Sequence, residues 1–490
     1  MLSTLASTGT KGLDDIIGGG LPRNRSYLIQ GQPGSGKTTL AVQFLLEGLR
    51  AGEKSLYVTL SESREEIEGV ADSHGWSLGD LAILELSAIE ELIGVENVTT
   101  MLHPAEIDLK RTIDRVMVEI DRLRPHRIVI DSLAELRLLA QDPLRYRRQL
   151  LALKQNLSRR RATVLLLDDR ASHGDDLQVQ SIVHGVISLE RMASAYGTVR
   201  RRAVVDKLRG VGYRTGYHDY VIERGGCVIF PRLIAAEHHA PHDEAPMSSG
   251  VEALDAMLAG GIELGSNLLL LGPAGSGKSS IATCFIHAAC QRGEKVVVWG
   301  FEETNTTLFQ RATGLGMDIR PFVPTGLLSP RQVDPAVLSP GELAHSIRRD
   351  VEQYGVKLVV IDSLSGYLAS MPAEEHLHLH LHELLTYLNQ QGVVTIMTMA
   401  QHGLIGTVKS ADVSYIADAV LMLRFFEAFG AIKKAISVIK KRTGGHEDTI
   451  REFSLAGGQV RVGEPLAKFQ GVITGTPTYH GEVANILPAP

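Results

Sequence analysis

Two copies of one glycine-rich motif carry the clearest chemistry in this sequence. Residues 31–38 read GQPGSGKT and residues 272–279 read GPAGSGKS, so both match G-x-x-x-x-G-K-[ST], between an apolar run and a stretch with helical spacing. In this motif backbone N–H groups curl around a β-phosphate, the lysine reaches the β- and γ-oxygens, and the hydroxyl ligates Mg²⁺. We therefore expect two sites for ATP and Mg²⁺, with Thr38 and Ser279 as metal ligands. The candidate ATP-binding residues of the two motifs are Gly31, Gly34, Ser35, Gly36, Lys37, Thr38, Thr39, Gly272, Gly275, Ser276, Gly277, Lys278, Ser279 and Ser280.

Each copy also contains an apolar run that ends in aspartate. Asp131 follows Ile128–Ile130, and Asp362 follows Val359–Ile361. Ligands of open parallel sheets bind at the carboxyl ends of the strands, where an aspartate can hold a Mg²⁺-bound water. We therefore add Asp131 and Asp362 to the candidate ATP-binding residues.

Glutamates that follow the second apolar run of each copy are candidate bases. Residues 301–303 read FEE, whereas residues 60–62 read LSE. A carboxylate here could accept a proton from water or from a hydroxyl that attacks the γ-phosphate, which makes Glu62, Glu302 and Glu303 candidate catalytic residues. The alternative for Glu62 and Glu303 is a solvated charge or a structural hydrogen bond. Because the first copy has a serine hydroxyl where the second has a carboxylate, we expect the copies to differ in catalytic competence.

A basic pair lies late in each copy, on a segment with the alternating pattern of a strand. The pairs are Lys207 with Arg209 and Lys440 with Arg442, and we name all four as candidate catalytic residues. Their charges could neutralise a phosphate during its transfer. A single domain of this type leaves one edge of its nucleotide exposed, so we expect the pairs to act on a neighbouring subunit, which implies a ring. The alternative is an exposed basic hairpin.

These motifs recur because the chain contains the same domain twice. A constant separation of 241 positions joins three matching pairs, Asp14 and Asp255, Lys37 and Lys278, and Glu62 and Glu303. Such a period is far longer than the roughly 20–50 residues of a solenoid repeat. We expect an N-terminal domain over residues 1–236, a linker over 237–247, a C-terminal domain over 248–464 and a C-terminal loop and tail over 465–490.

The elements that must position these residues alternate between short apolar runs and amphipathic stretches. Continuous runs predict strands that are buried on both faces of a parallel sheet. The predicted strands are Tyr27–Gln30, Leu56–Leu60, Arg127–Ile130, Thr163–Leu167, Val186–Leu189, Asn267–Leu271, Val296–Trp299, Leu358–Ile361, Val393–Met399 and Val420–Leu423. Stretches such as Thr38–Arg50 and Glu374–Gln391 supply covering helices. The expected fold class is α/β, with two tandem P-loop NTPase domains, each a mainly parallel sheet with helices on both faces.

The composition excludes several other classes of protein. The formal charge is −6, from 50 Lys and Arg against 56 Asp and Glu, so the chain lacks the basic bias of a general duplex-DNA coat. It has no run near the roughly 18 apolar residues of a membrane span and no basic, apolar leader at its start. Its three cysteines form no C-x-x-C pair, which suits a reducing compartment. We expect a cytoplasmic protein without a membrane or nucleic-acid partner.

Taken together, these motifs resemble those of the KaiC family of RecA-like ATPases, the circadian-clock ATPase and autokinase group. The resemblance covers residues 7 to about 479 and rests on the S-x-G-x-x-x-L-D openings, both P-loops, Glu302 with Glu303, both Ile-Asp-Ser strands and both K-x-R segments. It implies a homohexamer of two stacked rings with ATP at every subunit interface. It further implies slow hydrolysis mainly in the first ring, serine/threonine autophosphorylation in the second, and a role as a timer or switch. Residues 469–478 resemble the C-terminal loop of the family, so a regulatory protein could contact the tail.

The resemblance also points to phosphoacceptors. In the family these are adjacent hydroxyl residues, and the matching segment here is residues 411–418. Ser414 matches the serine acceptor, whereas Tyr415 stands where clock members usually have threonine. The tyrosine oxygen lies several ångströms further from its Cα, so we expect kinase activity on Ser414, with Glu302 as base and Tyr415 unmodified or slow. The alternative is a buried hydroxyl on an interface strand.

Two other functions stay open at this point. One is a scaffold that uses ATP to assemble its rings and dock a partner without kinase activity. The other is a DNA-dependent RecA-type motor, which would need a DNA-binding module and basic pore loops. Two side-chain clusters have plainer interpretations: the histidines of residues 376–382 as a solvated or interface helix face rather than a Zn²⁺ site, and the arginines of residues 145–161 as a solvated helix face rather than a nucleic-acid patch.

Overall fold

The computed structural model of this chain describes residues 4–86, 104–140, 142–169, 176–193, 197–241, 245–334, 336–369, 377–400, 415–473 and 477–480. The chain divides into two compact units, Met1–Arg232 and Leu233–Pro490. We call them unit 1 and unit 2 and describe each by itself.

Unit 1 is built on a sheet of nine strands within the described residues, in the order β11-β10-β9-β8-β3-β7-β6-β4-β5. The six strands from β8 to β5 in this order run parallel, and β9, β10 and β11 extend the sheet antiparallel. The strands of unit 1 are β1 (Leu5–Ala6), β2 (Leu21–Pro22), β3 (Ser26–Gly31), β4 (Ser55–Thr59), β5 (Ala82–Glu85), β6 (Arg127–Asp131), β7 (Thr163–Asp169), β8 (Gly185–Met192), β9 (Arg200–Leu208), β10 (His218–Glu223) and β11 (Gly226–Phe230).

Unit 2 repeats this sheet strand for strand. Its described residues form the order β16-β15-β17-β18-β14-β19-β20-β21-β22, which is the order of unit 1 read from the other edge. The strands of unit 2 are β12 (Pro246–Met247), β13 (Ile262–Glu263), β14 (Asn267–Gly272), β15 (Lys295–Gly300), β16 (Leu328–Gln332), β17 (Val356–Asp362), β18 (Val394–Ala400), β19 (Ala419–Ala428), β20 (Ala431–Lys441), β21 (Arg451–Ala456), β22 (Gln459–Pro465), β23 (Phe469–Gln470) and β24 (Thr478–Tyr479).

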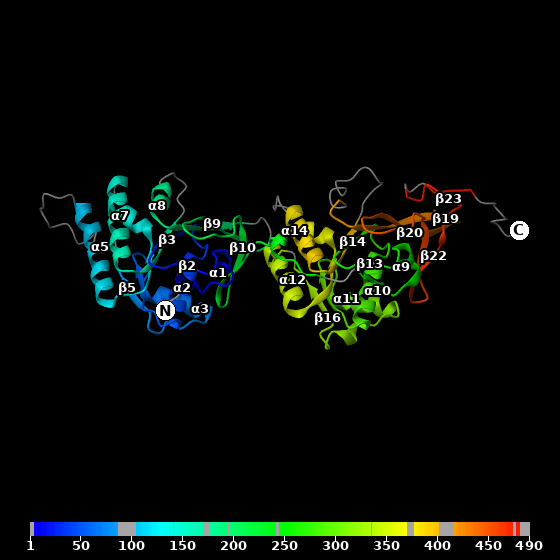
Figure 1. Cartoon of the computed structure of the whole chain (residues 1–490), viewed down its shortest axis with the longest axis horizontal. Coiled ribbons are helices and arrows are strands. Elements are labelled where there is room, and N and C mark those ends of the chain that lie inside the picture. Colours follow the sequence, from blue (N-terminus) through cyan, green and yellow to red (C-terminus); the bar gives the residue numbers. More distant parts are fainter. Residues whose placement is uncertain are drawn as a thin grey trace, which may run out of the picture. The chain divides into compact units, whose positions relative to one another are not determined.

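Helices lie on both sides of each sheet (Figure 1). In unit 1 they are α1 (Leu13–Ile16), α2 (Lys37–Arg50), α3 (Arg64–His74), α5 (Pro104–Leu123), α6 (Leu133–Ala140), α7 (Pro143–Arg159) and α8 (Asp176–Ile182). In unit 2 they are α9 (Glu252–Met257), α10 (Lys278–Gln291), α11 (Asn305–Gly314), α12 (Pro340–Tyr354), α13 (Leu364–Ala369) and α14 (Leu377–Gln390), with 3-10 turns at Ala235–Glu237 and Arg320–Phe322.

Alternate residues of each central strand face two separate cores. In β3, Tyr27 and Ile29 pack with α1, α2 and α3, whereas Leu28 packs in the core that α5, α6, α7 and α8 cover. This arrangement explains why the central strands are apolar throughout, since both faces of the sheet are buried.

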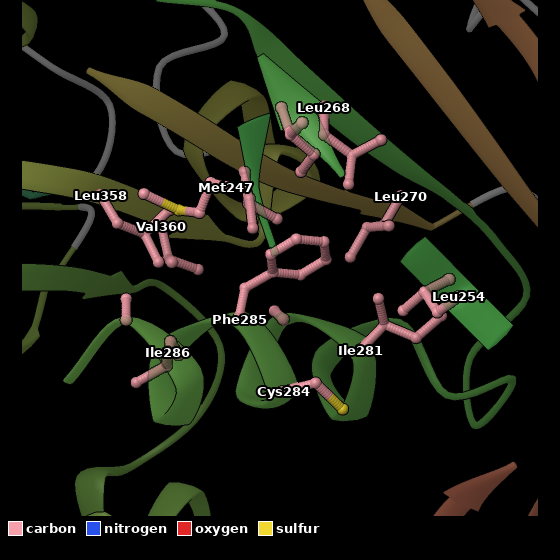
Figure 2. Packing of buried hydrophobic residues seen from close by; sticks show 14 of the residues in the cluster. Met247, Leu254, Leu268, Leu270, Ile281, Cys284, Phe285, Ile286, Leu358 and Val360 are labelled. Atoms are coloured by element: carbon pink, nitrogen blue, oxygen red, sulfur yellow. The ribbon is translucent and has the colours of Figure 1, made fainter. Parts of the chain in front are cut away.

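The same division holds in unit 2. Figure 2 shows Ile281 and Phe285 of α10 beneath Leu268 and Leu270 of β14, in the core that α9, α10 and α11 cover. Leu269 of the same strand lies in the opposite core with α12, α13 and α14. Phe285 is fully buried, so its truncation to alanine would cost about 3–5 kcal/mol of folding free energy.

The expected fold class is confirmed: both units are α/β, with mainly parallel sheets covered on two faces. The segment between the two repeats makes defined contacts with unit 2. The ring of His238 packs edge-on against Tyr387 at 5.3 Å, and the Ala240 N–H donates to the Gln390 carbonyl. Residues 237–241 therefore belong structurally to unit 2, while the domain limits of the sequence analysis stay a prediction.

Among the described residues, none of the helices is long and apolar enough to cross a membrane.

Candidate active sites

Both P-loops lie at the carboxyl end of a central strand and lead directly into a helix. Gly31 ends β3 and Lys37 begins α2, while Gly272 ends β14 and Lys278 begins α10. The residue before each lysine has a positive φ, 91° at Gly36 and 113° at Gly277. A Cβ at Gly36 would also lie 2.6 Å from Ile222 Cδ1. Only glycine fits this left-handed turn, which aims the helix N-terminus into the loop.

The residues of each P-loop fit a phosphate group. Ser35 and Ser276 are fully buried, and their hydroxyl oxygens have no hydrogen-bond partner among the described residues. The Lys278 ammonium donates to the carbonyls of Gly272 and Pro273, both at 2.8 Å, and burial lowers its pKa against the raising effect of Asp362 and Glu302. A buried hydroxyl, an ammonium and a helix N-terminus are donors that suit phosphate oxygens.

The third residue of each helix, Thr39 or Ser280, was also a candidate for ATP binding. Thr39 and Ser280 are buried, and the Thr39 hydroxyl lies 3.4 Å from His74 Nε2 of α3.

Asp131 lies beside the first P-loop, at the end of β6. Its Oδ2 accepts hydrogen bonds from the Tyr57 hydroxyl at 2.6 Å and the Thr38 hydroxyl at 3.3 Å, and burial raises its pKa. In unit 2, Asp362 Oδ1 accepts instead from the Thr398 hydroxyl at 2.5 Å. The Asp131 carboxylate and the Thr38 hydroxyl supply oxygen ligands of the kind that Mg²⁺ prefers. Phosphate and water would be its remaining ligands.

No complete protein-only metal cage is present among the described residues, where no group of three or more His, Cys, Asp or Glu side chains could hold an ion. Because Mg²⁺ at a P-loop takes most of its ligands from phosphate and water, such a cage is not required.

The three candidate bases have different surroundings. Glu62 Oε2 is buried without a hydrogen-bond partner among the described residues, and burial, followed by the charges of Asp131 and Glu66, raises the pKa of Glu62 to about 7. In unit 2, Glu302 accepts a hydrogen bond from the Ser363 hydroxyl at 2.5 Å, whereas Glu303 forms an ion pair with Arg311 of α11. Glu62 and Glu302 are therefore available for proton transfer, and Glu303 is held by Arg311 of the helix that follows it.

Sequence reasoning missed a charged cluster in unit 1. Asp169, at the end of β7, forms a 2.7 Å ion pair with the P-loop Lys37, and the neighbouring Asp168 pairs with Arg137 of α6. The Ser132 hydroxyl also donates to Glu135 of α6. In the sequence, these residues could be noticed only as charges that follow two apolar runs, residues 127–131 and 163–167. Parallel sheets bind their ligands at such strand ends.

The basic pairs lie at the amino end of the sheet, away from the P-loop of their own unit. The Lys207 ammonium donates to the carbonyls of Gln180 and Val183, and the Arg209 N–H donates to the His184 carbonyl. The His184 N–H in turn donates to Ser26, which begins β3, so Arg209 lies about 16 Å along the strand from the P-loop.

The pair of unit 2 has the same position relative to its sheet. The Arg442 guanidinium donates to Asp418 Oδ1 at 3.1 Å and to the Tyr415 carbonyl at 2.6 Å, and Lys440 donates to the Ala417 carbonyl. The structure therefore does not bring either basic pair to the P-loop of its own unit.

The candidate acceptor segment is only partly described. Ser414 lies outside the described residues, and Tyr415 is 57% exposed. The neighbouring Asp418 accepts from Asn267, Asn389 and Arg442. This network holds the start of β19 and, through Arg442, the backbone of Tyr415.

Comparison with known proteins agrees with this geometry. The family model described as "ATPase: KaiC" matches residues 6–234 and 247–467, one stretch in each unit. The circadian clock oscillator protein KaiC of Acaryochloris marina is 28% identical over 483 residues, which cover 96% of this chain and 91% of that protein. The circadian clock protein KaiC3 of Synechocystis sp. is 28% identical over 484 residues, 96% of this chain and 94% of that protein. The chain therefore belongs to the KaiC family of ATPases, with one copy of the family domain in each unit.

Proposed function

We propose that both units bind ATP with Mg²⁺, that unit 1 hydrolyses it slowly, and that unit 2 transfers its γ-phosphoryl group to Ser414. The observation that carries this proposal is a pair of P-loop sites with the same backbone and different carboxylates. In unit 1 Glu62 has a free, buried oxygen, and in unit 2 Glu302 is held by the Ser363 hydroxyl. Because the candidate bases differ, we assign a different acceptor of the γ-phosphoryl group to each site. The acceptor is water in unit 1 and a serine in unit 2.

In unit 1, Glu62 is the proposed base. Its pKa of about 7 allows it to accept a proton near neutral pH from water that attacks the γ-phosphorus. Lys37 would leave Asp169 to bind the β- and γ-oxygens. The Thr38 and Ser279 hydroxyls would hold Mg²⁺, which neutralises charge on the phosphate oxygens.

In unit 2, Glu302 is the proposed base for phosphoryl transfer. Because Arg442 holds Tyr415 at the amino end of the sheet, away from the P-loop of its own unit, Glu302 would act on Ser414 of the adjacent subunit. It takes the proton of that hydroxyl while the serine oxygen bonds to the γ-phosphorus and the bond to the β-phosphate oxygen breaks, leaving ADP. The hydrogen bond from Ser363 orients the Glu302 carboxylate. Tyr415 is exposed, and its longer side chain does not place its oxygen where a threonine oxygen would lie.

We also propose a homohexamer of two stacked rings. The support is the position of the basic pairs, since an arginine side chain cannot span about 16 Å to its own P-loop. Arg209 and Arg442 would instead complete the nucleotide site of the adjacent subunit, which requires a closed ring. Such an assembly fits a regulatory timer or switch, because every site then senses its neighbour.

The C-terminal tail is the proposed contact for a regulatory protein. Phe469 packs against Phe426 at 5.5 Å and against Tyr479 at 5.1 Å, and Phe429 packs against Tyr479 at 5.3 Å. These aromatic rings, with Phe429 largely exposed, hold the β23–β24 hairpin on unit 2.

Mass spectrometry of the native assembly and of the intact chain after incubation with ATP tests this function. The expected result is a hexamer that gains one phosphate per chain at Ser414 and releases phosphate, and Ser414→Ala should abolish the added mass without changing assembly. Rings that form with ATP but gain no phosphate would favour the scaffold alternative. Turnover that rises several-fold with DNA would favour the RecA-type motor.

A further inference from the structure

In each unit, the serine that follows the site aspartate donates a hydrogen bond to a glutamate. The glutamate comes from a different element in the two units. In unit 2, the Ser363 hydroxyl donates to Glu302, which follows β15. In unit 1, the equivalent Ser132 donates to Glu135 on α6, and the residue that matches Glu302 is Ser61. Each serine directly follows the aspartate of its site.

In the packing of unit 2, a side chain at the position of the helix glutamate would crowd the strand-end glutamate. Gly366 of α13 is the residue that matches Glu135. A Cβ at Gly366 would lie 2.9 Å from Phe301 Cβ, 3.2 Å from Glu302 Cγ and 3.4 Å from Glu302 Oε1. A side chain on the helix therefore competes with the strand-end glutamate for one space. Unit 1 combines a small strand-end residue with a glutamate on the helix, and unit 2 has the reverse.

We propose that Glu135 is the positioning residue of the first nucleotide site and supplies, from α6, the carboxylate that unit 2 supplies through Glu302. This inference rests on the proposed hydrolysis in unit 1. Glu135 orients the Ser132 hydroxyl beside Asp131, and its charge acts on both Asp131 and Glu62. The change to serine at position 61 therefore moves a carboxylate within the site rather than removing it.

Glu135→Gln tests the proposal because it keeps the shape of the side chain and removes its charge. The full-length chain with Glu302→Gln serves as the starting protein, so that phosphate release reports unit 1. We expect kcat to fall about 10- to 100-fold while KM and the amount of bound nucleotide stay unchanged, since misplacement of supporting groups has effects of this size. Glu65→Gln, an equal change of charge at an exposed position of α3, should keep the kcat of the starting protein.

Relocation of the carboxylate gives the sharper test. Ser61→Glu combined with Glu135→Gly builds the arrangement of unit 2 into unit 1, and we expect it to restore kcat to within about threefold of the starting protein. A double-mutant cycle with Ser132→Ala is the second measurement and does not depend on the folding of the relocated variant. If Glu135 acts through Ser132, the double variant loses no more than the larger single loss.

Three results would overturn the inference. They are an unchanged kcat in Glu135→Gln, a folded relocated variant that stays as slow as Glu135→Gln, and fully additive losses in the Ser132 cycle. A starting protein without any turnover would refute the proposed hydrolysis in unit 1 and this inference with it. Normal turnover in both the starting protein and Glu135→Gln would refute the inference alone.

Discussion

Unit 1 and unit 2 share a backbone and differ in the charges that line it. The strand order and the P-loop turn are the same in both, yet three charged residues of the first site, Glu135, Asp168 and Asp169, match Gly366, Met399 and Ala400 in the second. Arg137, the partner of Asp168, matches Leu368. The first site is therefore a network of charges, whereas the second has apolar or small residues in the same places.

These differing residues lie at or beyond the carboxyl ends of the strands rather than in their interiors. Residues inside the central strands face two packed cores, so a change of volume or polarity there costs folding free energy. Residues at and beyond the carboxyl ends of the strands face the nucleotide site instead. At the four positions compared above, divergence between the repeats alters the charges of the site while the strand order stays the same.

The largest expected effect comes from Arg209 and Arg442, which occupy the same position in unit 1 and unit 2. Arg209→Ala should lower phosphate release by unit 1 about 10³-fold, and Arg442→Ala should slow phosphorylation of Ser414 to a similar extent, because an arginine finger typically contributes this much. Bound nucleotide should change little. Phosphate release and phosphopeptide analysis measure the two effects, with Arg320→Ala, an exposed arginine paired with Asp318, as control.

Mixing experiments decide whether these arginines act on a neighbour. Chains with Arg209→Ala and chains with Glu62→Gln are each slow alone. Mixed rings contain interfaces with an intact Arg209 from one chain and an intact Glu62 from the next, so part of the turnover should return. If no activity returns in rings shown to be mixed, Arg209 does not act between subunits.

The acidity of Glu62 gives a smaller effect that separates the two sites by pH. Burial and the negative charges of Asp131, Glu66 and Glu135 raise the pKa of Glu62 to about 7, while Lys37 opposes the shift. A base must be ionised, so kcat of unit 1 should rise with pH, reach half its maximum near pH 7 and fall about tenfold for each further unit of acidity. The profile is measured with Glu302→Gln present, and a profile that stays flat down to about pH 5 would exclude Glu62 as the base.

The smallest expected effect concerns the ion pair between Lys37 and Asp169, whose match in unit 2 is Ala400. Lys37 must leave Asp169 before it can bind phosphate, so Asp169→Ala, which introduces the residue of unit 2, should tighten ATP binding to unit 1 about two- to fivefold. Ala400→Asp should weaken binding to unit 2 by a similar factor. Equilibrium binding of a fluorescent ATP analogue measures both. Weaker binding in Asp169→Ala would show that Asp169 assists the nucleotide rather than competing with it.

The sequence predicted the fold well because its signals are strong and local. Residues 27–30 and 267–271 are apolar throughout, and they lie inside β3 and β14. Gly36 has a positive φ and no room for a Cβ, so the backbone of the P-loop requires glycine at this position of the motif. Helix α14 lies within the predicted stretch 374–391.

The remaining features depend on side-chain contacts that no sequence motif marks. Glu135 matches no motif, and only the structure shows its hydrogen bond with Ser132, in the unit that has Ser61 where the other unit has Glu302. The sequence analysis named Glu303 as a candidate base and left a structural role open, and in the structure Glu303 forms an ion pair with Arg311 of α11. The polar composition of residues 237–247 predicted a linker, and within it the ring of His238 packs against Tyr387 of unit 2.

Parallel measurement of ATP turnover and Ser414 phosphorylation in Glu62→Gln and Glu302→Gln tests the central claim most directly. If the two sites perform different reactions, Glu62→Gln loses most of the phosphate release and keeps Ser414 phosphorylation, and Glu302→Gln shows the opposite pattern. Equal losses of both activities in both variants would contradict the claim, because they would mean that the two glutamates serve one shared reaction.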